Sequence, residues 1–187
     1  MTTFTITTGS GKPVLGLRET PMLVLGTLSG MGLGSQIAEL DGDLGGIISA
    51  EIQERGFQGE LGKYFTVELE RPGIPQNILV LGLGSPEKFD RKAITRAIKI
   101  AVARAVKLGC NKLTIPILPN RQTQGKLNLR GQAYIIREAV EQKLKDLKAE
   151  GALEVEFLCS PQAKVHLVRG LACKRMNDKG ECSYSED

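Results

Sequence analysis

The chain has 187 residues, of which 41% are hydrophobic and 25% charged, proportions that are typical of a folded globular domain. No apolar run approaches the ~18 residues that cross a bilayer, which argues against a membrane protein. The opening residues 1–6 lack both the basic region and the long apolar stretch of a signal peptide, so we expect a cytoplasmic protein.

The net charge of +4 is unevenly distributed along the chain. Residues 1–90 hold 6 Lys/Arg against 11 Asp/Glu, whereas residues 91–187 hold 19 against 10, so the two halves carry −5 and +9. A basic C-terminal half can attract an anionic partner or an acidic neighbouring subunit. Charge alone does not distinguish these partners.

The N-terminal half shows the alternation of strands and helices that is typical of an α/β protein. Residues 1–8 alternate weakly, as an edge strand does, and residues 21–28 form an apolar strand that leads into a glycine-rich turn. Residues 40–56 follow a helical period, with Asp43 as the expected N-cap and Gly56 as the stop. Residues 62–70 alternate in polarity, which predicts a strand with one face in water.

The clearest unit lies in the middle of the chain. An apolar strand at 77–83 enters a glycine-rich turn, a long amphipathic helix follows at 90–108, and a second apolar strand occupies 111–118. This order is typical of two parallel strands joined by a crossover helix. Seven residues form the apolar stripe of that helix: Ile94, Ala97, Ile98, Ala101, Val102, Ala105 and Val106.

The remaining elements continue the same alternation. A polar segment at 119–128 predicts a mobile loop, followed by a helix at 129–149 and a strand at 153–159. Ser160 before Pro161 opens a last helix that we expect to run to about Arg175. The whole pattern predicts a three-layer α/β/α sandwich with a mixed, mainly parallel sheet. One domain is expected over 1–176, and 177–187 is expected to be a loose tail.

Three stretches resemble the N-terminal domain of the leucyl (cytosol) aminopeptidase family. The first runs from Leu40 to Gly62 and contains Phe57-Gln-Gly-Glu-Leu-Gly62, the second is Ile78-Leu-Val-Leu-Gly-Leu-Gly-Ser-Pro86 with its helix, and the third is residues 153–175. The resemblance covers about residues 20–176, and it implies a macro-domain-like fold.

The resemblance also implies where catalysis takes place. In that family, two divalent metal ions, Zn²⁺ or Mn²⁺, are held by a C-terminal catalytic domain whose Asp/Glu/Lys motifs do not occur in this sequence. We therefore expect no catalytic residue and no metal ligand on this chain, and no peptidase activity from the chain alone. Its expected partners are such a catalytic domain, in cis or in trans, and further copies of itself in a homo-oligomer.

Metal binding and nucleophilic catalysis have little support from the residues themselves. The only histidine, His166, lies about two helical turns from Cys173, too far to share one ion without a chain reversal. Cys110, Cys159, Cys173 and Cys182 are too few and too scattered for a disulfide framework, so reduced thiols are expected.

Two glycine-rich turns are candidates for a small-molecule site. Gly82, Gly84 and Ser85 connect a strand to a helix, where glycine lets a phosphate approach the backbone and the helix offers free N–H groups. If the strands are parallel, Gly30 and Gly32 provide a second wall. Macro-domain relatives bind ADP-ribose in such a place, although close packing of strand and helix explains the glycines equally well.

The helix at 90–108 is a candidate for an interaction surface. Residues 91–107 of this helix include six cations and no acid, and Arg91, Lys92, Arg96 and Lys99 are the expected contacts with nucleic acid. Interleaved aromatic residues are missing from this helix, so stacking of single-stranded bases has no support in the sequence. A solvated helix face is the favoured alternative.

Overall fold

The computed structural model describes residues 2–9, 18–119, 128–177 and 182–183. The expected mobile loop at 119–128 and the expected loose tail therefore fall largely outside the described residues. The strands are β1 (Thr3–Thr8), β2 (Met22–Thr27), β3 (Tyr64–Glu68), β4 (Asn77–Gly82), β5 (Lys112–Pro116), β6 (Glu154–Cys159), β7 (Arg175–Met176) and β8 (Cys182–Ser183). The helices are α1 (Ser35–Asp43), α2 (Ile47–Arg55), the 3₁₀ turn η1 (Pro86–Lys88), α3 (Arg91–Lys107), α4 (Leu129–Asp146) and α5 (Pro161–Ala172).

Six of the strands form one sheet in the order β1-β6-β5-β2-β4-β3. All neighbours pair in parallel except β3, which is antiparallel to β4. This confirms the predicted mixed, mainly parallel sheet. The predicted strand with one face in water is also confirmed, because β3 buries Phe65 and Val67 and turns the alternate side chains outward.

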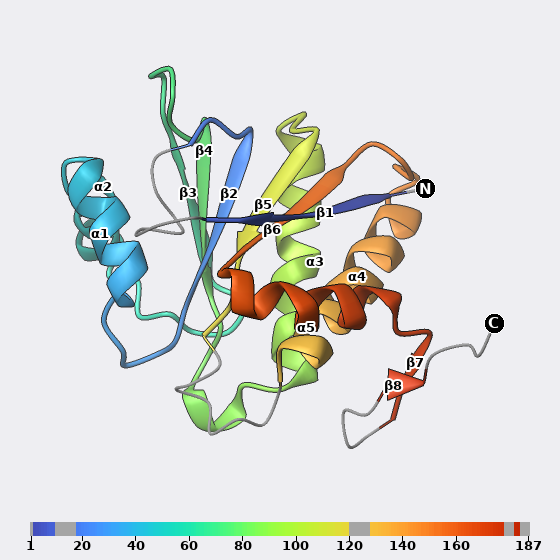
Figure 1. Cartoon of the computed structure of the whole chain (residues 1–187). Coiled ribbons are helices and arrows are strands. Elements are labelled where there is room, and N and C mark those ends of the chain that lie inside the picture. Colours follow the sequence, from blue (N-terminus) through green and yellow to red (C-terminus); the bar gives the residue numbers. More distant parts are fainter. Residues whose placement is uncertain (1, 10–17, 120–127, 178–181, 184–187) are drawn as a thin grey trace.

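Helices cover both faces of the sheet, as Figure 1 shows. Helices α3, α4 and α5 pack on one face, where the apolar stripe of α3 joins alternate residues of β2, β4, β5 and β6 in the larger core. Helices α1 and α2 cover β2, β4 and β3 on the other face, in a smaller core built around Leu40, Ile48, Phe65 and Val80. The arrangement is the predicted three-layer α/β/α sandwich.

The helix expected at 40–56 is in fact two helices. Gly45 and Gly46 have φ values of 75° and 80°, which end α1 and start α2 on a new axis. Asp43, the expected N-cap, is an exposed residue at the end of α1. The carboxylate that caps α2 belongs to Asp41, which accepts the backbone N–H of Ile48 at 2.7 Å. The predicted stop at Gly56 is confirmed, because Gly56 is left-handed with φ of 58°.

The C-terminal end departs from the prediction in one respect. Helix α5 ends at Ala172 rather than near Arg175, and β7 and β8 then pair antiparallel. β8 lies within the stretch expected to be loose. Arg137 of α4 holds this end of the domain by donating to the backbone oxygen of Cys173 at 2.8 Å.

Within the described ranges, no helix is both long and apolar enough to span a membrane.

Candidate functional site

A cavity of about 570 Å³ opens at the carboxyl ends of the parallel strands β2, β5 and β6. Ligands of α/β proteins bind preferentially at this edge, where the strands end and the following helices begin. The cavity is lined by Val24, Leu25, Gly26, Gly34, Ser35, Gln36, Ile37, Pro116, Ile117, Leu118, Pro119, Leu129, Leu158, Cys159, Ser160 and Ala163. Most of the lining residues are apolar, but backbone groups and the side chains of Ser35, Gln36 and Ser160 make nearly half of the cavity surface polar.

Two helices present their N-terminal ends to this cavity. Gly34 is the N-cap of α1 and Ser160 is the N-cap of α5, and neither makes a side-chain capping hydrogen bond. Neither helix carries an acidic residue in its first turn. The free N–H groups and the positive end of each helix dipole therefore favour an anionic group between them.

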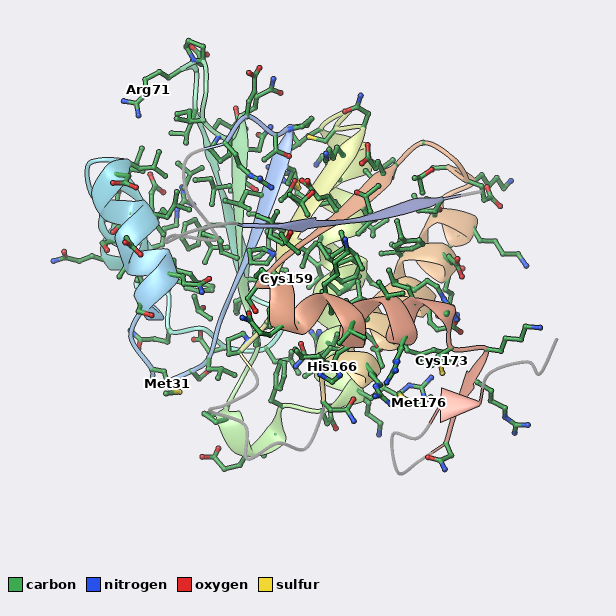
Figure 2. All side chains as sticks on the ribbon, viewed as in Figure 1. Met31, Arg71, Cys159, His166, Cys173 and Met176 are labelled. Atoms are coloured by element: carbon green, nitrogen blue, oxygen red, sulfur yellow. The ribbon has the colours of Figure 1, made fainter. Side chains whose placement is uncertain are left out.

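Cys159 lines the same cavity at the point where β6 meets α5 (Figure 2). Burial raises the pKa of the Cys159 thiol, and the positive charge of Lys164 offsets this effect only in part. A neutral thiol is a poor nucleophile.

The glycines predicted to bind a ligand at 82–85 are instead in contact with another segment of the chain. A Cβ at Gly82 would stand 2.1 Å from the backbone oxygen of Glu60, and Gly84 donates to the oxygen of Gly59 at 3.0 Å. Gly84 also has φ of +78°. Close packing of this turn on residues 59–62 therefore accounts for both glycines, and Ser85 is half-buried beyond them.

The two glycines predicted to form a second wall of the small-molecule site also lie apart from the cavity. Gly30 and Gly32 are exposed, and a Cβ built on either would meet no atom within 4 Å. The strands β2 and β4 are parallel, as that prediction required, yet none of Gly30, Gly32, Gly82 and Gly84 lines the hollow. The residues that do so at the same edge belong to the ends of β2, β5 and β6 and to the segments that follow them, and the Ser160-Pro161 helix start was the sequence signal for one of these segments.

A second hollow is a basic groove of about 800 Å³ along α3. It contains all four residues predicted to contact nucleic acid, and the fold adds Tyr64 from β3 and Lys143 from α4. The groove is lined by Gly62, Tyr64, Arg91, Lys92, Thr95, Arg96, Lys99, Ile100, Ala103 and Lys143. Tyr64 is 46% exposed, which gives the groove an aromatic wall that the sequence of α3 does not reveal.

Metal-ligating residues do not gather in the described parts of the chain. Over those residues, no group of three or more His, Cys, Asp and Glu side chains is placed to hold an ion. His166 is exposed on α5 whereas Cys173 is buried beyond its end, and Figure 2 shows the two apart. The described side chains therefore do not fit the two ions of the family's catalytic domain.

The order of the strands and the position of the cavity define a macro-domain-like α/β protein. The sequence model for the N-terminal domain of the cytosol aminopeptidase family matches residues 24–144, so the chain belongs to that family. A probable cytosol aminopeptidase of Picosynechococcus sp. is 37% identical over 71 residues, which make up 38% of this chain and 14% of that protein.

Solved structures give the same fold. A mutant of tomato leucine aminopeptidase superposes with a TM-score of 0.60 at 18% identity, over 90% of this chain and 36% of that one. A Trypanosoma brucei macrodomain, solved in complex with ADP, superposes with a TM-score of 0.68 at 15% identity, over 90% of this chain and 69% of the macrodomain. The chain thus spans about a third of the tomato enzyme and most of the macrodomain.

Proposed function

We propose that this chain serves as the non-catalytic N-terminal domain of a leucyl aminopeptidase, a metal-dependent exopeptidase that releases N-terminal amino acids. The family match over residues 24–144 carries this proposal. Its role is to pack against the catalytic domain and against neighbouring subunits of a homo-oligomer, and thereby to frame access to the catalytic centre.

Association with a catalytic domain tests this role. We expect the purified chain to co-elute with a separately produced aminopeptidase catalytic domain from the same organism in size-exclusion chromatography with light scattering. A matched control replaces the catalytic domain by an unrelated protein of equal size and charge. Association that is absent, or weaker than a dissociation constant of about 1 mM, contradicts the packing role.

A second candidate function is the binding of ADP-ribose or a related phosphate compound in the cavity at the ends of β2, β5 and β6. Two uncapped helix starts face a cavity there whose surface is part apolar and part polar, which suits a phosphate group next to an aromatic base. The same fold occurs in the Trypanosoma brucei macrodomain, which was also solved in complex with ADP-ribose. Nucleotide binding by this chain is therefore proposed for the cavity rather than for Gly82–Ser85.

A variant at Gly34 separates ligand binding from folding. Aspartate is a good N-cap, so Gly34→Asp leaves α1 intact while its carboxylate takes the place of the phosphate. We expect calorimetric titration to show ADP-ribose binding to the native chain and none to this variant. Gly32→Asp adds the same charge to the same loop outside the cavity and is expected to bind normally. No heat from the native chain at millimolar ADP-ribose contradicts the proposal.

A further inference from the structure

The groove along α3 combines cations with an apolar floor. Five cations line it, namely Arg91, Lys92, Arg96 and Lys99 of α3 and Lys143 of α4, and no lining residue is acidic. Among the described residues, no carboxylate forms an ion pair with any of the five. Ile100 and Ala103 are half-buried between them, and Tyr64 stands at one side.

Two of the exposed arginines lie against neighbouring groups of the fold. The guanidinium of Arg96 lies against the backbone of Gly62, where a side chain would collide with it. The guanidinium of Arg91 lies over the ring of Tyr134, 5.8 Å from its centroid. Planar guanidinium groups of this kind can bind a carboxylate or a phosphate in a bidentate manner.

The shape of the groove limits what it can hold. Its lining residues on α3 run from Arg91 to Ala103, which corresponds to a length of ~18 Å along the helix axis. The neighbouring hollow between α3 and α4 shares Arg91 and Thr95 with the groove and contains Glu138 and Glu141. A broad polyanion that extended from the groove onto α4 would meet these carboxylates, whereas a narrow segment confined to the groove would not.

We propose that this groove binds a short amphipathic helix of a partner protein, with carboxylates that meet the five cations and apolar side chains that pack on Tyr64, Ile100 and Ala103. Helices commonly bind in grooves of this kind through an apolar face. Single-stranded nucleic acid is less well matched, because it needs several stacking rings and the groove offers one. The proposal is independent of the catalytic-domain role and of the nucleotide cavity.

The test uses a fluorescein-labelled peptide of about 16 residues, which as a helix spans ~24 Å, with Glu on one face and Leu on the other. We expect its anisotropy to rise on binding to the whole chain, and the affinity to fall between about 0.05 and 0.5 M salt. A peptide with every Leu replaced by Ser keeps the charge and is expected to bind at least about tenfold more weakly, since it buries no apolar surface.

Variants of the chain locate the binding surface. Lys92→Glu reverses an exposed charge in the first turn of α3, where an acid also suits the helix dipole, and we expect it to weaken binding about tenfold or more. Lys164→Glu makes the same change in the first turn of α5, outside the groove, and is expected to shift affinity by less than about twofold. Tyr64→Ser, at an exposed position, is expected to weaken binding without lowering the melting temperature.

Four results of the binding experiments would overturn the proposal. These are no binding of the Glu/Leu peptide at millimolar concentration, equal binding of the Ser peptide, equal effects of Lys92→Glu and Lys164→Glu, and tighter binding of oligothymidylate than of the peptide. The last result would identify the groove as a nucleic-acid surface. Self-association of the chain that Lys92→Glu abolishes would assign the groove to a second copy and would likewise overturn the proposal.

Discussion

The guanidinium of Arg96 lies directly against Gly62, so that a Cβ atom at Gly62 would stand 2.6 Å from the Nε atom of Arg96. Gly62 also has φ of +88°, a conformation that L side chains rarely adopt. Because Gly62 has no side chain, the edge of the sheet can approach the basic helix closely at this point. Gly62 therefore contributes both to the turn before β3 and to one side of the groove.

Gly62→Ala is therefore expected to be costly. The new methyl group must push Arg96 away and hold a strained backbone, which lowers the free energy of unfolding by about 2 kcal/mol. Gly73→Ala is the matched control, because Gly73 has φ of +77° and no atom lies within 4 Å of an added Cβ. This substitution therefore lowers the free energy of unfolding through backbone strain alone. Urea denaturation measures both, and equal losses would show that the Arg96 contact contributes nothing.

Asp41→Ala tests the cap that joins α1 to α2. The Asp41 carboxylate is buried and accepts the N–H groups of Ile48 and Ser49 as well as the Ser49 hydroxyl, so its loss leaves buried donors unpaired. We expect a loss of about 2 kcal/mol in the free energy of unfolding. Asp43→Ala, at the exposed position that the sequence favoured as the cap, should change stability by less than about 0.5 kcal/mol. The opposite ranking in thermal melts would contradict the assignment of the cap.

Glu156 makes the domain sensitive to acid. Burial alone raises the pKa of Glu156, but hydrogen bonds from Thr7 and Thr114 and the charges of Lys112 and Arg18 outweigh this effect and hold the pKa below its usual value. A lowered pKa in the folded state stabilises the protein at pH values above the unfolded pKa of about 4.3. This contribution is lost as the pH falls through the lower, folded-state pKa.

Glu156→Gln removes that titration. We expect the variant to be less stable than the native chain at pH 7, because the ion pairs are lost, and the difference to shrink as the pH falls through the acid range. Glu154→Gln on the same strand is a control, since its side chain is 38% exposed and contributes less. Stability measured by urea denaturation at several pH values gives the result, and a difference that does not vary with pH would refute the role of Glu156.

Arg137→Leu tests the attachment of the C-terminal end. Arg137 donates to the backbone oxygens of Leu171 and Cys173, and its guanidinium lies 5.2 Å from the centroid of the Tyr134 ring. Leucine keeps much of the packing but leaves both carbonyls without this donor. Hydrogen exchange should become faster at the end of α5 while β4 and β5 stay protected. Unchanged exchange at α5 would show that other contacts hold this end.

The fold follows from the sequence because its strongest signals are local and periodic. The apolar stripe of α3 and the buried runs at β4 and β5 identified the crossover unit, and this unit set the class of the whole sheet. The break between α1 and α2 escaped prediction, because a helical period continues through Gly45 and Gly46, and only their positive φ values end it. The capping role of Asp41 depends on that break.

The candidate sites were less predictable, because they depend on contacts between distant segments. A glycine-rich turn looks the same in sequence whether a phosphate or another stretch of backbone packs against it. In the fold, residues 59–62 pack against Gly82 and Gly84. Tyr64 reaches the basic groove only because β3 pairs at the edge of the sheet beside α3. The four cations of α3 line one groove, but their contact with nucleic acid stays a prediction, and the sequence did not indicate the aromatic wall that Tyr64 provides.

Hydrolysis of leucine amide by the purified chain, with Mn²⁺ or Zn²⁺ added, tests the central claim most directly. If the chain is a non-catalytic domain, release of leucine should equal that of a metal-only blank, and the same preparation should still show cooperative unfolding. Metal-dependent turnover that rises in proportion to the chain's concentration, and that survives repeated purification, would contradict the account.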